Sequence, residues 1–319
     1  MNIRLSAVKK FTFCNTPNIP LILPDGWVTL DVSHCGICRT DAKMWEQGHR
    51  DLVLPRVLGH EIIAHDSIQR YAIYPGITCG NCLYCQSGRE NLCDSMSIIG
   101  FHHDGGFGNT ISVPQDNCIP VAQELDSVTA TLAEPAGCIV HAFDKVRLKQ
   151  GVRVLIYGGG TMGLLAAIIA RHYGGEVDIL EKRSEKIDKA KAVDAFENFN
   201  FIDDVSVAYD IIILCCADCQ AFISSIVHAA KGAAIIFFSG LGDDRAVDTS
   251  AINSIHYKEL YLTGSYGLTK KDMYNSLQIL CKYKAAFKPL IEKVLHPDEI
   301  GGIMPDVLSG DYYRFVIAW

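Results

Sequence analysis

Four closely spaced cysteines in the first half of the chain have the residue type and spacing of a metal site. They lie in the run CGNCLYCQSGRENLC and are separated by two, two and seven residues. Four thiolates complete the tetrahedral coordination of zinc and leave no position for a substrate, so such a site supports structure. An iron–sulfur motif with the same beginning continues with three residues and Cys-Pro, whereas here seven residues intervene and Asp94 follows. We therefore predict a structural zinc site with the ligands Cys79, Cys82, Cys85 and Cys93.

A second metal site, built from different ligands, is indicated upstream of these cysteines. Cys38 lies in GICRTD, and His60 and Glu61 lie in GHE. Thiolate, imidazole and carboxylate groups all bind zinc, and a catalytic zinc site keeps one coordination position open. A zinc ion with an open position lowers the pKa of a bound oxygen, which assists the removal of hydride from an alcohol carbon. The second site is therefore predicted to be catalytic.

A glycine-rich turn in the second half of the chain predicts a dinucleotide site. Gly158, Gly160 and Gly163 form G-x-G-x-x-G, with Thr161 and Met162 between the last two glycines. The motif follows the strand-like RVLIY and precedes an apolar helix, which is the context that gives it meaning. There the glycines allow a tight turn, the approach of a pyrophosphate and close packing of helix on strand.

The choice between NAD and NADP depends on the residues that end the next predicted strand. Glu181 ends EVDILE and is placed to accept hydrogen bonds from the adenosine ribose hydroxyls, which favours NAD. Lys182 and Arg183 follow directly, and such cations can instead hold the 2'-phosphate of NADP. We expect NAD, with NADP as the alternative.

The pattern of apolar residues divides the chain into parts. Residues 1–137 are rich in short β-prone runs such as WVTLDVS, YAIYP and NTISVP, and are expected to form an irregular β domain. Strand-like and helix-like segments then alternate, which predicts an α/β domain over 138–268 with a doubly wound parallel sheet. The helical segments include TMGLLAAIIARHYG, SEKIDKAKAVDAF and CQAFISSIVHAA. Residues 269–319 are expected to return to the first domain.

Charge and cysteine usage exclude several classes of protein. A formal net charge of -7 gives no general attraction to a phosphate backbone, so we expect no nucleic-acid partner. We find no apolar run of the roughly 18 residues that a membrane helix needs and no signal peptide, and therefore expect no membrane partner. The thirteen cysteines are an odd number without an export signal, so reduced thiols and a cytoplasmic location are expected.

Several motifs in this order resemble the medium-chain zinc-dependent alcohol and polyol dehydrogenases. They are GICRTD, LPRVLGHE, the four-cysteine lobe at 79–93, GFHHDGGF, LAEPAGC, GGGTMG and TGSYG, and the resemblance covers nearly the whole chain. It implies a GroES-like catalytic domain followed by a Rossmann NAD(P)-binding domain. The implied activity is hydride transfer between a secondary alcohol, polyol or sugar-like, and a nicotinamide cofactor through a zinc-bound alkoxide, with two zinc ions per chain.

The resemblance also assigns roles around the catalytic metal. Cys38 and His60 match two zinc ligands, and Glu134 in LAEPAGC matches the third ligand of the polyol branch. Glu61 matches a glutamate that can approach the metal or hold its bound water. Asp41 matches a carboxylate that orients the ligand histidine and so fixes its tautomer.

Other positions depart from the family pattern. Thr40 matches the hydroxyl that passes the substrate proton, but Lys43 stands where the family often has the histidine that ends the relay. Lysine can serve there if desolvation lowers its pKa. Arg39 resembles a residue of the alcohol branch that contacts the cofactor pyrophosphate, with a solvated surface cation as the equal alternative. Cys35 matches no ligand of the family.

Other functions remain open from the sequence. Threonine-type amino alcohols and simple alcohols are alternative substrates, since the loops that read substrate hydroxyls cannot be placed. A zinc-binding scaffold protein and a metal-free reductase of activated double bonds are the alternatives outside this activity. We expect a small-molecule alcohol substrate and assembly as a homodimer or homotetramer.

Overall fold

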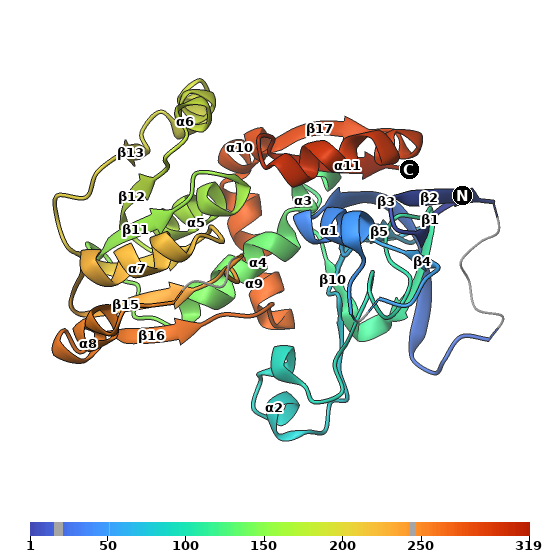
Figure 1. The fold of residues 1–319 in the computed structure, drawn as a ribbon. Helices are drawn as coiled ribbons and strands as arrows, with labels where there is room; N and C mark the ends of the chain where they lie inside the picture. The colour runs from blue at the N-terminus through green and yellow to red at the C-terminus, as the bar shows by residue number, and fades with distance from the viewer. Residues whose placement is uncertain (16–21, 51, 243–245) are drawn as a thin grey trace. The chain divides into compact units, whose positions relative to one another are not determined.

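The structure, a computed structural model, describes residues 1–15, 22–50, 52–242 and 246–319. The chain divides into two compact units (Figure 1). Unit 1 comprises Met1–Gly137 and Leu268–Trp319, and unit 2 comprises Cys138–Gly267. Among the described residues, the structure contains no helix with both the length and the apolar character needed to span a bilayer.

Unit 1 is built around a seven-stranded sheet in the order β10-β6-β5-β3-β18-β17, with β9 also paired to β3. All its pairings are antiparallel except that of β17 with β18. The last strand of the chain lies beside β3, with Ile317 opposite Cys35. The strands are β3 (Trp27–Ile37), β5 (Glu61–His65), β6 (Arg70–Ile73), β9 (Thr110–Pro114), β10 (Cys118–Pro120), β17 (Ile291–Leu295) and β18 (Arg314–Ala318).

Two small sheets and several short helices complete unit 1. The small sheets have the orders β2-β1-β4 and β7-β8. Their strands are β1 (Asn2–Ala7), β2 (Lys10–Cys14), β4 (Arg56–Val57), β7 (Gly76–Ile77) and β8 (Ser97–Ile98). The α-helices are α1 (Arg39–Gln47), α2 (Leu83–Gln86), α3 (Ser127–Ala130), α9 (Lys270–Lys282), α10 (Lys284–Phe287) and α11 (Ile300–Ser309), and α4 (Ala133–Asp144) contains the boundary between the units. The 3-10 helices are η1 (Glu90–Leu92), η2 (Gln115–Asn117), η4 (Lys288–Leu290) and η5 (Pro297–Glu299).

The core of unit 1 fixes the start of α1 against the sheet. Ile37 at the end of β3, Met44 on α1 and Leu58 before β5 are all buried in one apolar cluster. Burial of each such side chain stabilises the fold by about 1.5–3 kcal/mol. The segments that carry Cys38 and His60 are therefore held by packing on both sides.

Unit 2 has a six-stranded sheet in the order β13-β12-β11-β14-β15-β16, and every pairing in it is parallel. Counted from β11, this is the strand order 3-2-1-4-5-6 of a Rossmann fold, so the predicted doubly wound sheet is confirmed. The strands are β11 (Arg153–Tyr157), β12 (Glu176–Leu180), β13 (Asn200–Ile202), β14 (Tyr209–Leu214), β15 (Ala229–Phe237) and β16 (Tyr261–Gly264). The helices are α5 (Thr161–His172), α6 (Ser184–Lys191), η3 (Asp194–Phe196), α7 (Cys219–His228) and α8 (Thr249–Tyr257).

Two predicted helices end earlier than their apolar spacing indicated. The segment CQAFISSIVHAA is helical only to His228, and β15 begins at the next residue. Lys258 explains this end, because its Nζ donates to the carbonyl oxygens of Ile226, Val227 and Ala229 at 2.7–3.0 Å. The segment SEKIDKAKAVDAF forms α6 only to Lys191 and then the short helix η3.

Candidate functional site

The four predicted structural ligands meet at one point on the lobe that carries α2 and η1. The sulfur atoms of Cys79, Cys82, Cys85 and Cys93 all lie within 4.8 Å of one another. Three of their separations are 3.5, 3.5 and 3.9 Å. Four sulfurs bound to one zinc ion at about 2.3 Å would lie about 3.8 Å apart, so this cluster fits a tetrahedral zinc ion.

Backbone amides lower the pKa of two of these thiols, which favours the thiolate form that binds a metal. The amides of Asn81 and Cys82 lower the pKa of Cys79, and those of Cys85 and Asp94 lower the pKa of Cys82 to about 6. Loss of solvation raises the pKa of Cys85 to about 12, and the neighbouring thiols add to the rise. Four thiolates at this distance repel one another unless a cation lies among them.

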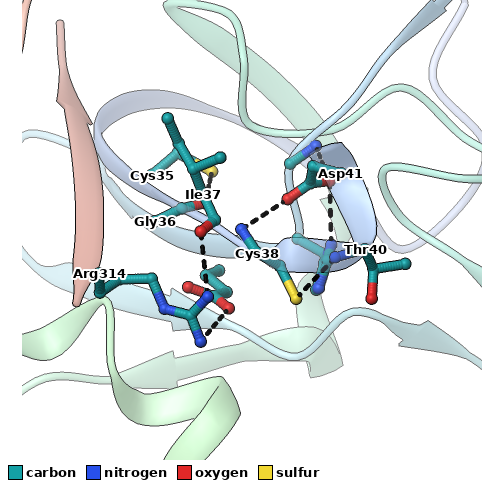
Figure 2. Close-up of polar contacts among 10 residues, drawn as sticks. Cys35, Gly36, Ile37, Cys38, Thr40, Asp41 and Arg314 are labelled. Atoms are coloured by element: carbon teal, nitrogen blue, oxygen red, sulfur yellow. Dashed lines mark hydrogen bonds and ion pairs between the residues drawn. The ribbon is translucent and has the colours of Figure 1, made fainter. Parts of the chain in front are cut away.

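The second cluster contains Cys38, His60 and Glu61, whose ligand atoms also lie within 4.8 Å of one another. Cys38 is the N-cap of α1, and its sulfur accepts from the amide of Thr40 at 3.4 Å (Figure 2). His60 immediately precedes β5, and Glu61 is its first residue. His60 and Glu61 are both buried, whereas Cys38 is half-buried.

Asp41 ties the two segments of this cluster together. Its side chain is fully buried and accepts from the amide of Cys38 at 2.9 Å and from that of Gly59 at 3.2 Å. Its Oδ1 also lies 3.4 Å from Nδ1 of His60. Burial alone would lower the pKa of His60, but Asp41 and the Cys38 sulfur raise that pKa well above its ordinary value. The structure thus brings Asp41 beside the histidine that it is predicted to orient.

A glycine opposite Glu61 makes room for its carboxylate. Gly36 on β3 pairs with Glu61 on β5, and a Cβ at Gly36 would lie 2.2 Å from Oε2 of Glu61. Any larger residue at this position would push the carboxylate away. The close approach therefore requires glycine, and the carboxylate that it admits belongs to the cluster.

Arg314 is a member of this site that the sequence did not reveal. It is the first residue of β18, and its Nη2 lies 3.3 Å from Oε1 of Glu61. Its Nη1 donates to the carbonyl oxygen of Ile37 at 3.0 Å (Figure 2). Burial raises the pKa of Glu61 to about 7, with Glu134 and Asp41 adding to the rise and Arg314 and His60 opposing it. A lone arginine before the apolar run FVIAW was the only available signal.

The remaining predicted residues of unit 1 lie around this cluster. Glu134, half-buried in the first turn of α4, is close enough to affect the pKa of Glu61 but is outside the group of three ligand atoms. Thr40 and Lys43 lie on α1, and Lys43 is exposed. Arg39 is exposed and donates from Nη2 to the carbonyl oxygen of Leu308 at 3.2 Å.

The donor set of the second cluster fits a zinc ion. Among the described residues, neither buried carboxylate oxygen of Glu61 has a hydrogen-bond partner, and Arg314 forms an ion pair with Oε1 alone, so the buried charge is only partly compensated. A thiolate, an imidazole and a carboxylate are ligands that zinc accepts, and three protein ligands leave a fourth position open. The carboxylate grouped with Cys38 and His60 is that of Glu61, and the ligand role implied for Glu134 stays a prediction.

In unit 2, the predicted glycine turn connects β11 to α5. Gly160 is the N-cap of α5, and Gly158 has a φ of 102°, which favours glycine. A Cβ at Gly163 would lie 1.7 Å from the carbonyl oxygen of Gly158, so helix and strand approach too closely for a side chain. Thr161 and Met162 begin the helix, and the N-terminus of a helix favours an anion. The turn therefore fits a dinucleotide pyrophosphate.

The acidic residue after β12 lies against this turn. Glu181 is buried, and its carboxylate accepts from the amides of Gly159 at 2.8 Å and Arg183 at 3.0 Å. Lys182 is exposed and pairs with Asp218 at 3.2 Å. Lys186 on α6 was not predicted, but its Nζ lies 4.0 Å from the position of a Cβ at Gly160. Its approach to Gly160 depends on where α6 lies, which the sequence alone does not show.

Comparisons with known proteins agree with this geometry. Residues 24–123 match the alcohol dehydrogenase GroES-like domain. The chain is 29% identical to an uncharacterized zinc-type alcohol dehydrogenase-like protein of Haemophilus influenzae, over 89% of this chain and 88% of that protein. It is 34% identical to L-galactonate-5-dehydrogenase of Escherichia coli over 57% of this chain and 56% of that protein. It is 26% identical to D-xylulose reductase A of Aspergillus oryzae over 98% and 95% of the two chains.

Solved structures share the fold over the full chain. Galactitol-1-phosphate dehydrogenase of Escherichia coli superposes with a TM-score of 0.87 at 20% identity, covering 100% of this chain and 99% of that one. Acetophenone reductase of Geotrichum candidum superposes with a TM-score of 0.84 at 23% identity, covering 100% and 96%.

These matches define an oxidoreductase that acts on CH–OH donors. The chain is similar to zinc-type alcohol dehydrogenases and to polyol dehydrogenases, which bears out the family resemblance read from its motifs.

Proposed function

We propose that this protein is an NAD-linked dehydrogenase that oxidises a secondary alcohol of a polyol or sugar-like substrate, with zinc in the cluster of Cys38, His60 and Glu61. The observation that carries the proposal is the convergence of these three ligand atoms within 4.8 Å. A relative that reduces xylulose and another that oxidises galactonate support the polyol class. The structural zinc belongs, in this proposal, to Cys79, Cys82, Cys85 and Cys93.

The chain's own residues would prepare the alcohol for hydride loss. Zinc with an open position acts as a Lewis acid toward the substrate oxygen. Asp41 lies 3.4 Å from Nδ1 of His60, so Nε2, on the other side of the ring, would be the nitrogen that binds zinc. Thr40 and Lys43 are three residues apart on α1, and neighbours at this spacing share a helix face. We assign the first step of proton removal to Thr40 and the exchange with solvent to the exposed Lys43.

The cofactor would bind at the turn that follows β11. Gly158, Gly160 and Gly163 shape the turn, and the amides that begin with Thr161 and Met162 face the pyrophosphate. Glu181 then faces the adenosine ribose, which favours NAD over NADP. Lys186 supplies positive charge beside Gly160. The assignment of Arg39 to the cofactor stays a prediction.

A substrate panel with metal analysis tests this proposal. Xylitol, sorbitol, L-threonine and simple secondary alcohols would each be assayed with NAD and NADP. We expect the highest kcat/KM with a polyol and NAD, two zinc ions per chain, and loss of activity with a chelator that added zinc reverses. Iron in place of zinc, or reduction of an enone without metal, would contradict the proposal. A kcat/KM for L-threonine above that for every polyol would favour the alternative that the substrate is an amino alcohol.

We also propose a homodimer, or a homotetramer made from two such dimers. The strand β16 lies at the edge of the parallel sheet and exposes Tyr261 and Leu262 by 58% and 43%. An exposed edge strand with apolar side chains is a template for pairing with another chain. Light scattering should give a multiple of the 35.1 kDa chain mass, and Leu262→Lys should lower it. A single-chain mass for the wild type would exclude this assembly.

We place the protein in the cytoplasm, because both proposed zinc sites depend on cysteines that must remain reduced. A cytosolic redox poise keeps such thiols available to metals.

A further inference from the structure

Asp218 lies at the end of unit 2 where the cofactor is proposed to bind. It follows β14, which is the neighbour of β11 on the side opposite β12. Ligands of such sheets bind beyond the carboxyl ends of the strands, where the strand order reverses. Cys216, two residues earlier, has its Cβ 3.5 Å from the position of a Cβ at Gly158. Asp218 therefore stands beside the dinucleotide turn.

Both carboxylate oxygens of Asp218 accept a hydrogen bond. Oδ1 accepts from the amide of Gln220 at 2.8 Å, which makes Asp218 the N-cap of α7. Oδ2 accepts from Nζ of Lys182 at 3.2 Å. The cap fixes the orientation of the carboxylate before any cofactor arrives. The carboxylate is thus a preformed partner for Lys182.

The ion pair contributes little to stability, so its removal should leave the fold intact. The side chains of Lys182 and Asp218 are 68% and 43% exposed. Exposed pairs of this kind stabilise proteins by about 0–1 kcal/mol. Lys182, however, directly follows Glu181, the residue proposed to face the adenosine ribose. The pair therefore controls the charge next to the position that distinguishes NAD from NADP.

We infer that Asp218 is a specificity-determining residue, which excludes NADP by holding Lys182 in an ion pair. The inference rests on the proposed dinucleotide function. Lys186 differs from Lys182, because it lies beside Gly160 of the turn rather than after Glu181. Its charge serves the pyrophosphate that both cofactors share. Lys182 is the cation that could bind a 2'-phosphate once it is no longer paired with Asp218.

The substitution Asp218→Asn isolates the charge from the helix cap. Asparagine caps a helix as well as aspartate does, so the amide of Gln220 keeps its acceptor. Dissociation constants for NADH and NADPH would be measured by isothermal titration calorimetry on the zinc-loaded protein, without substrate. We expect NADPH to bind about threefold to tenfold more tightly, the range for one charge contact near solvent, and NADH to change by less than about twofold. The gain for NADPH should shrink at high ionic strength.

Two further variants test the route through Lys182. Lys182→Met should leave NADPH binding of the wild type nearly unchanged, because Asp218 already neutralises this cation. In the Asp218→Asn background, the same substitution should remove most of the gain. Asp248→Asn is the matched control, since Asp248 caps α8 of the same unit by accepting from the amide of Ser250 at 2.8 Å.

The outcomes separate this inference from the proposed function. If the wild type binds neither cofactor, the dinucleotide function fails and the inference fails with it. If NADH binds but Asp218→Asn leaves the NADH to NADPH ratio unchanged, only the inference is overturned. An equal gain in Asp248→Asn, or a gain that persists without Lys182, would likewise overturn the assignment of selectivity to this ion pair.

Discussion

Replacing Cys38 by serine, or His60 by alanine, is expected to lower kcat/KM by about a thousandfold or more, since zinc Lewis acidity supplies several kcal/mol to the reaction. Cys38→Ser is the cleaner of the two variants. Cys38 caps α1 through its sulfur, and serine is a favoured N-cap residue, so the helix start is preserved while the thiolate is lost. The measurements are steady-state kinetics together with the zinc content of each purified variant.

The fold and the cofactor site should survive both substitutions. Both residues lie in unit 1, whereas the glycine turn and Glu181 lie in unit 2. We therefore expect unchanged circular dichroism, unchanged NADH binding and a zinc content that falls from two ions to one. Full activity in either variant would refute the assignment of the catalytic metal to this cluster.

The same measurements decide which carboxylate completes the ligand set. Glu61→Gln should reduce zinc retention, as Cys38→Ser does, because the Glu61 carboxylate lies within the group of ligand atoms. Glu134→Gln should keep both zinc ions, whatever its effect on turnover. Loss of zinc only in the Glu134 variant would restore the ligand set implied by the family resemblance.

The fold and the metal-binding cysteines were predictable because their signals are local. Four cysteines within one short run must meet if they bind one metal. RVLIY, the glycine turn and the apolar helix after it form one continuous strand–turn–helix unit. Tertiary context overrode the local signal only at helix ends, as where Lys258 caps the carbonyls at the end of α7.

The rest of the candidate site depends on residues that are distant in sequence. The position of Glu61 depends on the register of β3 with β5, which places Gly36 opposite it. Arg314 reaches Glu61 only because β18 lies beside β3. Asp218 meets Lys182 because β12 and β14 flank the same strand. No local sequence pattern predicts these three contacts, because each depends on the order and register of the strands.

Above pH 7, where the Glu61 carboxyl is ionised, Arg314→Met is expected to destabilise the metal-free protein by about 3–5 kcal/mol, the usual cost of breaking a buried ion pair by removing one partner. The side chain of Arg314 is 8% exposed and that of Glu61 is fully buried. Methionine fills much of the same volume but leaves the carboxylate without its cation. Urea unfolding followed by circular dichroism measures the change. The loss should be smaller in the zinc-loaded protein, where the metal supplies positive charge beside Glu61.

Two comparisons test whether this loss comes from the pair itself. Glu61→Gln combined with Arg314→Met should recover much of the stability, because neither charge is then left buried and alone. Arg56→Met breaks the pair with Asp104 at 3.0 Å, whose side chains are 18% and 24% exposed, and should cost less. An equal loss in both arginine variants would show that Arg314 contributes through packing alone. A loss that the double variant does not relieve would lead to the same conclusion, since Glu61 would then gain nothing from its arginine.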